Sequence, residues 1–234
     1  MIIFDKSFTY PKLERIDSPD GRKYVTPDGE ALASVTTILG ATKSDESKKA
    51  LESWAKRVGQ KEADNIKNTA AAVGTIIHNQ LEKYLLGEEL KWGNNMIQKV
   101  ARKMTDTIIS QGLSKITRIY GMEVPLYMEH LYAGTADLII EVDGKILIGD
   151  FKNSLKIKKE EHLDDYYAQL TFYALAHNNM FGTNINSGLI MMVARPNEST
   201  GLCDYKEFEL TPAKFSKFED MCYIRLEEYY SRNG

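Results

Sequence analysis

Residues 134–152, GTADLIIEVDGKILIGDFK, contain two runs of apolar and β-branched residues on either side of Asp143-Gly144. Such runs favour β-strands, and Asp-Gly is a strong signal for a two-residue hairpin turn. With a loop of that length, the pairing register places Asp137 directly opposite Asp150. Asp150 and Lys152 share one face of the hairpin, because side chains alternate along a strand.

Two opposed aspartates in an otherwise apolar hairpin need a physical explanation. Directly opposed Cβ atoms lie roughly 4.5–5.5 Å apart, and like charges at that distance destabilise a sheet. A cation bound between the carboxylates relieves the repulsion, and oxygen-rich sites suit Mg²⁺ or Mn²⁺. A metal ion with a neighbouring lysine is suited to hydrolysing a phosphodiester, because the ion polarises the phosphoryl oxygen while Lys152 orients water or neutralises charge. The alternative is that these aspartates are solvated strand ends without a chemical role.

The pattern outward from this hairpin predicts an α/β fold, a mixed central β-sheet flanked by helices, with an N-terminal helical region. We expect one domain over residues 1–234, with a hairpin region to about residue 44, a helical region over about 45–112 and a catalytic α/β core over about 113–234. The expected strands are 23–26, 31–35, 116–128, 131–142, 145–151, 187–194 and 205–210, and the expected helices are 48–72, 76–86, 94–111, 159–178 and 212–230.

Several residues at the expected helix ends have the chemistry of helix boundaries. Ser44 or Asp45 is a suitable N-cap, while Gly87 and Gly112 are suitable C-terminal signals. Gly74-Thr75 indicates either a break in the helical region or a close contact with another element.

The composition excludes several classes of protein. The chain has 30 Lys and Arg against 33 Asp and Glu, so its formal net charge of -3 does not by itself indicate a nucleic-acid-binding protein. Two cysteines are too few for a disulfide scaffold or a cysteine-ligated iron–sulfur cluster. No apolar run is long enough to cross a membrane, and the N-terminus lacks the features of a signal or transit peptide. We therefore expect a cytoplasmic protein of a bacterium or a phage-infected host.

Five short motifs, in order, give the sequence a resemblance to a known family. Gly134-Thr135-Ala136-Asp137 and Gly149-Asp150-Phe151-Lys152 resemble the core of the PD-(D/E)XK nuclease superfamily, in its RecB-type branch, which has a restriction-endonuclease-like core. The other matching motifs are Gly74-Thr75-Ile76-Ile77-His78, Glu123 within Met122-Glu123-Val124-Pro125-Leu126, and Gln169-Leu170-Thr171-Phe172-Tyr173. Ser34-Val35-Thr36-Thr37-Ile38-Leu39, with Trp54 downstream, is similar to the exonucleases of mitochondrial genome maintenance and their phage relatives.

The resemblance implies a role for each matching residue. It implies that Glu123, Asp137, Asp150 and Lys152 are catalytic. The implied ligands of Mg²⁺ or Mn²⁺ are His78, Glu123, Asp137, Asp150 and the backbone carbonyl of Phe151. Gln169 and Tyr173 would hold the DNA strand or support the site. The charge pattern, separately from the resemblance, suggests that a basic run that includes Lys156 and Lys158 contacts backbone phosphates. Tyr166 and Tyr167 are interpreted as packing residues rather than as stacking platforms for bases.

The predicted function is that of a metal-dependent DNA exonuclease. Its expected partner is DNA, with a preference for single strands. In the related exonucleases, helices before the sheet form an arch through which single-stranded DNA threads, and residues 45–112 are long enough for one. The relatives suggest a role in phage or bacterial DNA replication, recombination or repair. Two alternatives stay open: a structure-specific endonuclease with the same site, and a nucleic-acid-binding module that does not cut. Digestion polarity, the number of metal ions and the oligomeric state are not predicted.

Overall fold

The structure, a computed structural model, describes residues 2–233; the predicted domain bounds Met1 and Gly234 lie outside this range. The strands are β1 (Ile3–Phe4), β2 (Glu14–Ser18), β3 (Gly21–Val25), β4 (Ala31–Ala33), β5 (Arg118–Met128), β6 (Tyr132–Val142), β7 (Lys145–Ser154), β8 (Gly188–Ala194) and β9 (Tyr205–Leu210). The helices are α1 (Val35–Ala41), α2 (Asp45–Val58), α3 (Gln60–Leu85), α4 (Met96–Gln111), α5 (Asp164–Phe181) and α6 (Pro212–Asn233), with short 3₁₀ turns η1 (Leu113–Lys115) and η2 (Glu160–His162).

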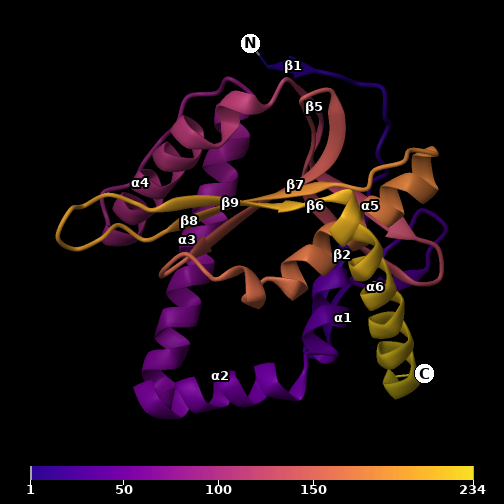
Figure 1. Cartoon of the computed structure of the whole chain (residues 1–234), viewed down its shortest axis with the longest axis horizontal. Helices are drawn as coiled ribbons and strands as arrows, with labels where there is room; N and C mark the ends of the chain where they lie inside the picture. The colour runs from indigo at the N-terminus through magenta and orange to yellow at the C-terminus, as the bar shows by residue number, and fades with distance from the viewer. Residues whose placement is uncertain (1, 234) are drawn as a thin grey trace.

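A mixed six-stranded sheet forms the centre of the fold (Figure 1). Its strand order is β1-β5-β6-β7-β8-β9, in which β1–β5 and β7–β8 are parallel and the other neighbours are antiparallel. The predicted α/β fold with a mixed, helix-flanked sheet is therefore confirmed. A second, three-stranded antiparallel sheet has the order β2-β3-β4.

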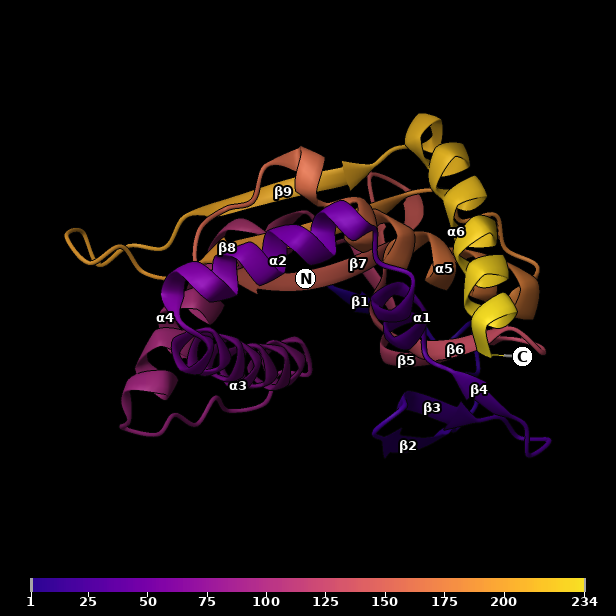
Figure 2. The ribbon, with the colours of Figure 1, turned by 90° about the horizontal axis from the view of Figure 1, so that it is seen from below.

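The two faces of the central sheet carry separate hydrophobic clusters. Ile139 and Ile148 pack with α1, α5 and α6 on one face. Leu138 and Ile140 pack with α3 and α4 on the other face, as expected from alternation along a strand. Figures 1 and 2 both show α3 beside α4 at one end of the molecule and α5 with α6 at the other.

The β6–β7 hairpin has the predicted register over its paired part. Val142 pairs with Lys145 across the two-residue turn, and the last pair of the ladder is Leu138 with Gly149. Beyond that pair the two strands separate, because β6 continues beside β5 and β7 continues beside β8 as far as Ser154. This fork begins at the next position along each strand, where Asp137 and Asp150 lie, so the predicted pairing of these two residues in the hairpin is not formed.

The N-terminal region differs from the prediction in two places. Val35 was expected in a strand, but β4 ends at Ala33 and the Ser34 hydroxyl accepts a hydrogen bond from the Thr37 amide, capping α1. Three β-branched residues in the first turn concealed this helix. The long helical region breaks at Gly59, whose φ of 88° ends α2, and not at Gly74.

The second helix runs apart from the sheet. Figure 1 shows α2 crossing from the end of α1 to the start of α3, away from the strands, and none of its residues is buried. Ser44 is its N-cap, as predicted, and Asn95 is the N-cap of α4. Across residues 2–233, no helix combines the length and the apolar character that a membrane span requires.

Candidate active site

Three potential metal ligands from different elements meet at the fork. His78 lies on α3, Glu123 on β5 and Asp137 on β6, and one ligand atom of each lies within 4.8 Å of the others. The His78 Nδ1 atom lies 3.5 Å from Asp137 Oδ2 and 3.8 Å from Glu123 Oε1. These are three of the residues that the sequence predicts as ligands, and they are separated by up to 59 positions along the chain.

Glu123 has an unusual backbone conformation within β5. The pairs Met122–Leu138 and Val124–Ala136 flank it, so Glu123 and Asp137 occupy opposed positions on neighbouring strands. The φ angle of Glu123 is 47°, a left-handed conformation that costs a non-glycine residue about 1–3 kcal/mol. Backbone conformations of this kind concentrate at functional sites.

The backbone of Phe151 links the other two ligands. Its N–H donates a hydrogen bond to Asp137 Oδ2 at 2.8 Å, and its carbonyl oxygen lies 3.1 Å from His78 Nε2. Because Nε2 faces this carbonyl, the Nδ1 atom of His78 is the ring nitrogen that faces the carboxylates. The carbonyl predicted as a ligand therefore lies beside the cluster, and it contacts the imidazole.

Helix α3 reaches the fork through a close contact at Gly74. A Cβ atom at Gly74 would lie 2.7 Å from Asn153 Oδ1, while the Asn153 amide donates to the Ala70 carbonyl at 2.9 Å. Gly74 thus allows α3 to approach β7 one turn before His78. Of the two predictions for Gly74-Thr75, the close contact is confirmed and the break is wrong.

Asp150 and Lys152 form an ion pair beside the cluster. The Lys152 Nζ atom lies 2.7 Å from Oδ1 and 2.6 Å from Oδ2 of Asp150, which is 2% exposed. Both side chains are on the same face of β7, as predicted. Asp150 is not one of the three residues whose ligand atoms lie within 4.8 Å, because its carboxylate contacts Lys152.

The pKa shifts follow from burial and from this concentration of acids. Burial lowers the pKa of His78, but Asp137 and Glu123 outweigh it and raise the pKa to about 9. Burial raises the pKa of the Asp150 carboxyl, although Lys152 opposes the shift. Burial also acts against the charge of Lys152, but Asp150 and Asp137 outweigh it and raise the Lys152 pKa. Lys152 is thus a cation at neutral pH and is not suited to accept a proton.

The donor set fits a divalent cation. One imidazole nitrogen and carboxylate oxygens from two strands suit Mn²⁺, and the carboxylates also suit Mg²⁺. Their ligand atoms lie within 4.8 Å of one another, which is close enough for all three residues to bind one ion. The residues that would hold the ion are His78, Glu123 and Asp137.

The predicted DNA-contacting residues lie on two segments next to the site. Gln169 Nε2 lies 3.3 Å from the Tyr173 hydroxyl one helical turn away on α5, and Tyr173 is buried against Gly134 of β6. Lys156 is exposed on the segment after β7, and Lys158 is half-buried there. Gln169 and Tyr173 therefore share a helix face, as predicted.

Sequence reasoning missed Glu82. Glu82 lies on α3 one turn after His78 and lines a small pocket with it, Glu123 and Asp137. Burial, then the nearby Glu123, raises the Glu82 pKa. The i, i+4 spacing from His78 was the available signal. Tyr166 packs against the core cluster, as predicted, and the Lys152 ammonium also lies 5.0 Å from its ring centre.

Comparisons with known proteins identify the family of the chain. The family model described as the PD-(D/E)XK nuclease superfamily matches residues 41–222. A crystal structure from Eubacterium rectale, described as a "putative exonuclease", superposes with a TM-score of 0.50 and 15% sequence identity. The match covers 69% of this chain and 66% of that protein, so the chain spans just under two thirds of its length. No curated protein matches the sequence. The family match spans well over half of the chain, which therefore belongs to the PD-(D/E)XK nuclease superfamily.

Proposed function

We propose that this protein is a metal-dependent DNA exonuclease of the RecB-type branch, similar to the mitochondrial and phage exonucleases, with a preference for single-stranded DNA. The observation that carries the proposal is the convergence of His78, Glu123 and Asp137 at the fork, beside the Asp150–Lys152 pair. Membership of a nuclease superfamily supports hydrolysis of phosphodiester bonds.

Each group has a chemical task in this proposal. His78, Glu123 and Asp137 would hold Mg²⁺ or Mn²⁺. The Asp150 carboxylate, which is paired with Lys152, and the Phe151 carbonyl, which lies 3.1 Å from His78 Nε2, would supply further oxygen ligands. When bound, the ion supplies a Lewis acid that polarises the scissile phosphoryl group. Lys152 orients the attacking water and neutralises charge that develops on the phosphate.

Two features support a single-stranded substrate. Helix α2 crosses from the end of α1 to the start of α3, away from the strands (Figure 1), and in this proposal it forms part of an arch through which single-stranded DNA threads. Between α2 and the start of α3 is a cleft of about 390 Å³, whose lining includes Trp54, the lysines Lys56 and Lys67 and the acids Glu52 and Asp64. An aromatic ring beside basic side chains suits stacking of bases and contact with phosphates in single-stranded nucleic acid.

Further groups support a grip on the strand near the site. Gln169 and Tyr173 are placed on α5 beside β6, and Lys156 and Lys158 follow β7 directly. In this proposal the lysines neutralise backbone phosphates, so binding weakens as the salt concentration rises.

A degradation assay with end-labelled substrates tests the proposal. The substrates are linear single-stranded DNA, linear duplex DNA and covalently closed circular single-stranded DNA, each with Mg²⁺, Mn²⁺ or EDTA. We expect fast digestion of linear single strands with either metal, slower digestion of duplex, and none with EDTA. Lys152→Ala should abolish digestion, whereas Lys145→Ala, an exposed lysine at the other end of β7, should not change it.

The alternatives give different outcomes in the same assay. Cutting of the closed circle would identify an endonuclease. Binding of DNA without digestion under any metal condition would identify a module that does not cut. Digestion that persists in EDTA, or in Lys152→Ala at the parent rate, would contradict the proposed site.

A further inference from the structure

Two lysines near the proposed active site lie close to the Tyr166 side chain. The Nζ atom of Lys152 is 5.0 Å from the ring centre, and the Nζ atom of Lys158 is 4.5 Å from it. Lys158 also donates a hydrogen bond to the Tyr166 hydroxyl at 2.7 Å. Cations within about 6 Å of an aromatic ring centre are attracted to its electrons. One phenol therefore contacts both ammonium groups.

The two lysines differ in how their charge is neutralised. Lys152 is paired with Asp150, whereas no carboxylate in the described part of the chain lies within 4.0 Å of the Lys158 ammonium. Its neighbour Lys159 is paired with Glu161 at 3.5 Å. Lys158 is half-buried, and its hydrogen bond to the Tyr166 hydroxyl orients the ammonium group. The positive charge remains available to bind an anion. A backbone phosphate of the substrate would supply a negative partner for the Lys158 ammonium.

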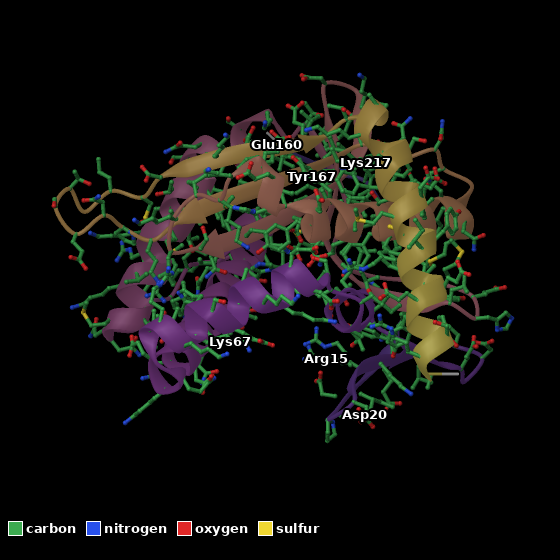
Figure 3. The ribbon with its side chains drawn as sticks, turned by 60° about the horizontal axis from the view of Figure 1, so that its bottom comes forward. Arg15, Asp20, Lys67, Glu160, Tyr167 and Lys217 are labelled. Atoms are coloured by element: carbon green, nitrogen blue, oxygen red, sulfur yellow. The ribbon has the colours of Figure 1, made fainter. Side chains whose placement is uncertain are left out.

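Tyr166 is distinct from the neighbouring Tyr167. Tyr167 is buried in the core, and its hydroxyl donates a hydrogen bond to Glu160 at 3.1 Å. Figure 3 shows Tyr167 and Glu160 near each other. Tyr166 is only partly buried and faces the lysines. The ring packs against the core cluster, and its remaining contacts include the ammonium groups of Lys152 and Lys158.

We propose that Tyr166 is a positioning residue that fixes Lys152 for catalysis and fixes Lys158 as the binding group for a backbone phosphate next to the scissile one. This inference rests on the proposed nuclease function and adds a residue and a phosphate contact to it. The ring acts on Lys152, and the hydroxyl acts on Lys158. The two tasks of Tyr166 are therefore separable by substitution.

Three variants separate the tasks. Tyr166→Phe keeps the ring and removes the hydroxyl, so it should raise KM about 3- to 10-fold with little change in kcat. Tyr166→Leu removes the ring and should lower kcat about 10-fold or more in addition. Lys158→Met should raise KM as Tyr166→Phe does and reduce the salt dependence of binding by about one phosphate contact. The controls are Tyr223→Leu, at an exposed tyrosine of α6, and Lys145→Met.

A double-mutant cycle on binding gives the decisive readout. Binding of labelled single-stranded DNA in EDTA is measured for the parent, Tyr166→Phe, Lys158→Met and the double variant. If the hydroxyl acts through Lys158, the Tyr166→Phe effect disappears in the Lys158→Met background. Equal effects of Tyr166→Phe in both backgrounds would overturn the proposal, as would a folded Tyr166→Leu protein with the parent kcat.

The outcomes also separate this inference from the proposed function. Thermal melting first establishes which variants fold, and if Tyr166→Leu does not, the binding cycle decides alone. If the parent digests no nucleic acid, the proposed function fails. Coupling between Tyr166 and Lys158 in the binding cycle would then still support the phosphate contact. An absence of coupling would end that inference as well.

Discussion

Asp137 accepts a hydrogen bond of 2.8 Å from the backbone N–H of Phe151, at the first position beyond the paired part of the β6–β7 hairpin. A side chain thus occupies the place of the next ladder hydrogen bond. The carboxylate is held at the point where the strands part, with an oxygen 3.5 Å from His78. The fork and the candidate ligand site therefore depend on the same residue.

The Asp150–Lys152 pair should dominate local stability. Removing one partner of a largely buried ion pair typically costs about 3–5 kcal/mol, because the other charge is left uncompensated. We expect Asp150→Asn and Lys152→Met each to lower the free energy of unfolding by about 3 kcal/mol. The double variant should lose less than the sum of the two. Urea denaturation of all four proteins gives the coupling, and strictly additive losses would contradict a direct pair.

Gly74→Ala should destabilise the protein, although alanine is normally the better helix former by about 1 kcal/mol. The new Cβ would lie 2.7 Å from Asn153 Oδ1, whose amide is held by Ala70. We expect a loss of about 1–2 kcal/mol in unfolding free energy. Gly40→Ala is the matched control, since Gly40 is an exposed residue of α1 with no atom within 4 Å of an added Cβ. The melting temperature of Gly40→Ala should equal or exceed that of the parent. A Gly74→Ala protein whose melting temperature rises by the same amount would refute the close contact.

His177 should make stability depend on pH. Burial lowers its pKa to about 4, from about 6.5 in the unfolded chain. The unfolded state therefore binds the extra proton between these values, so the contribution is complete above pH 6.5 and is lost as pH falls to 4. The loss should reach about 3 kcal/mol at most.

Replacing this histidine tests the assignment. His177 lies 3.2 Å from the Tyr10 hydroxyl and 2.8 Å from Thr183 Oγ1. His177→Gln should flatten the fall in unfolding free energy between pH 6.5 and 4, relative to the parent. His162→Gln, at an exposed histidine of η2, should leave the slope unchanged. A parent-like slope in His177→Gln would show that other groups cause the acid sensitivity.

The sequence predicts most of the sheet because strand periodicity and turn chemistry are local. The Asp143-Gly144 turn sets the hairpin register down to Leu138, and the β5–β9 strands lie within a few residues of their expected bounds. Strand β2 escaped prediction because its residues are all exposed and lack an apolar alternation. Helix α1 escaped because β-branched residues after Ser34 favour a strand locally, and the cap overrides them.

The candidate site was predictable as a set of residues but not as a geometry. Family-like motifs selected His78, Glu123 and Asp137, and the structure brings these three together. Their arrangement depends on the left-handed backbone of Glu123 and on the separation of β6 from β7, which no local pattern encodes. For the same reason the sequence did not indicate that the Asp150 carboxylate would contact Lys152, or that Tyr166 would contact two lysines.

The most direct test of the central claim, hydrolysis at the fork, is the initial rate of nucleotide release from end-labelled linear single-stranded DNA in Mn²⁺. It is measured for the parent, for Asp137→Asn and for Asp106→Asn, whose exposed carboxylate on α4 is remote in sequence from every candidate ligand. We predict that Asp137→Asn lowers the rate at least about 100-fold while Asp106→Asn stays at the parent rate. A folded Asp137→Asn protein that releases nucleotides as fast as the parent would contradict the claim.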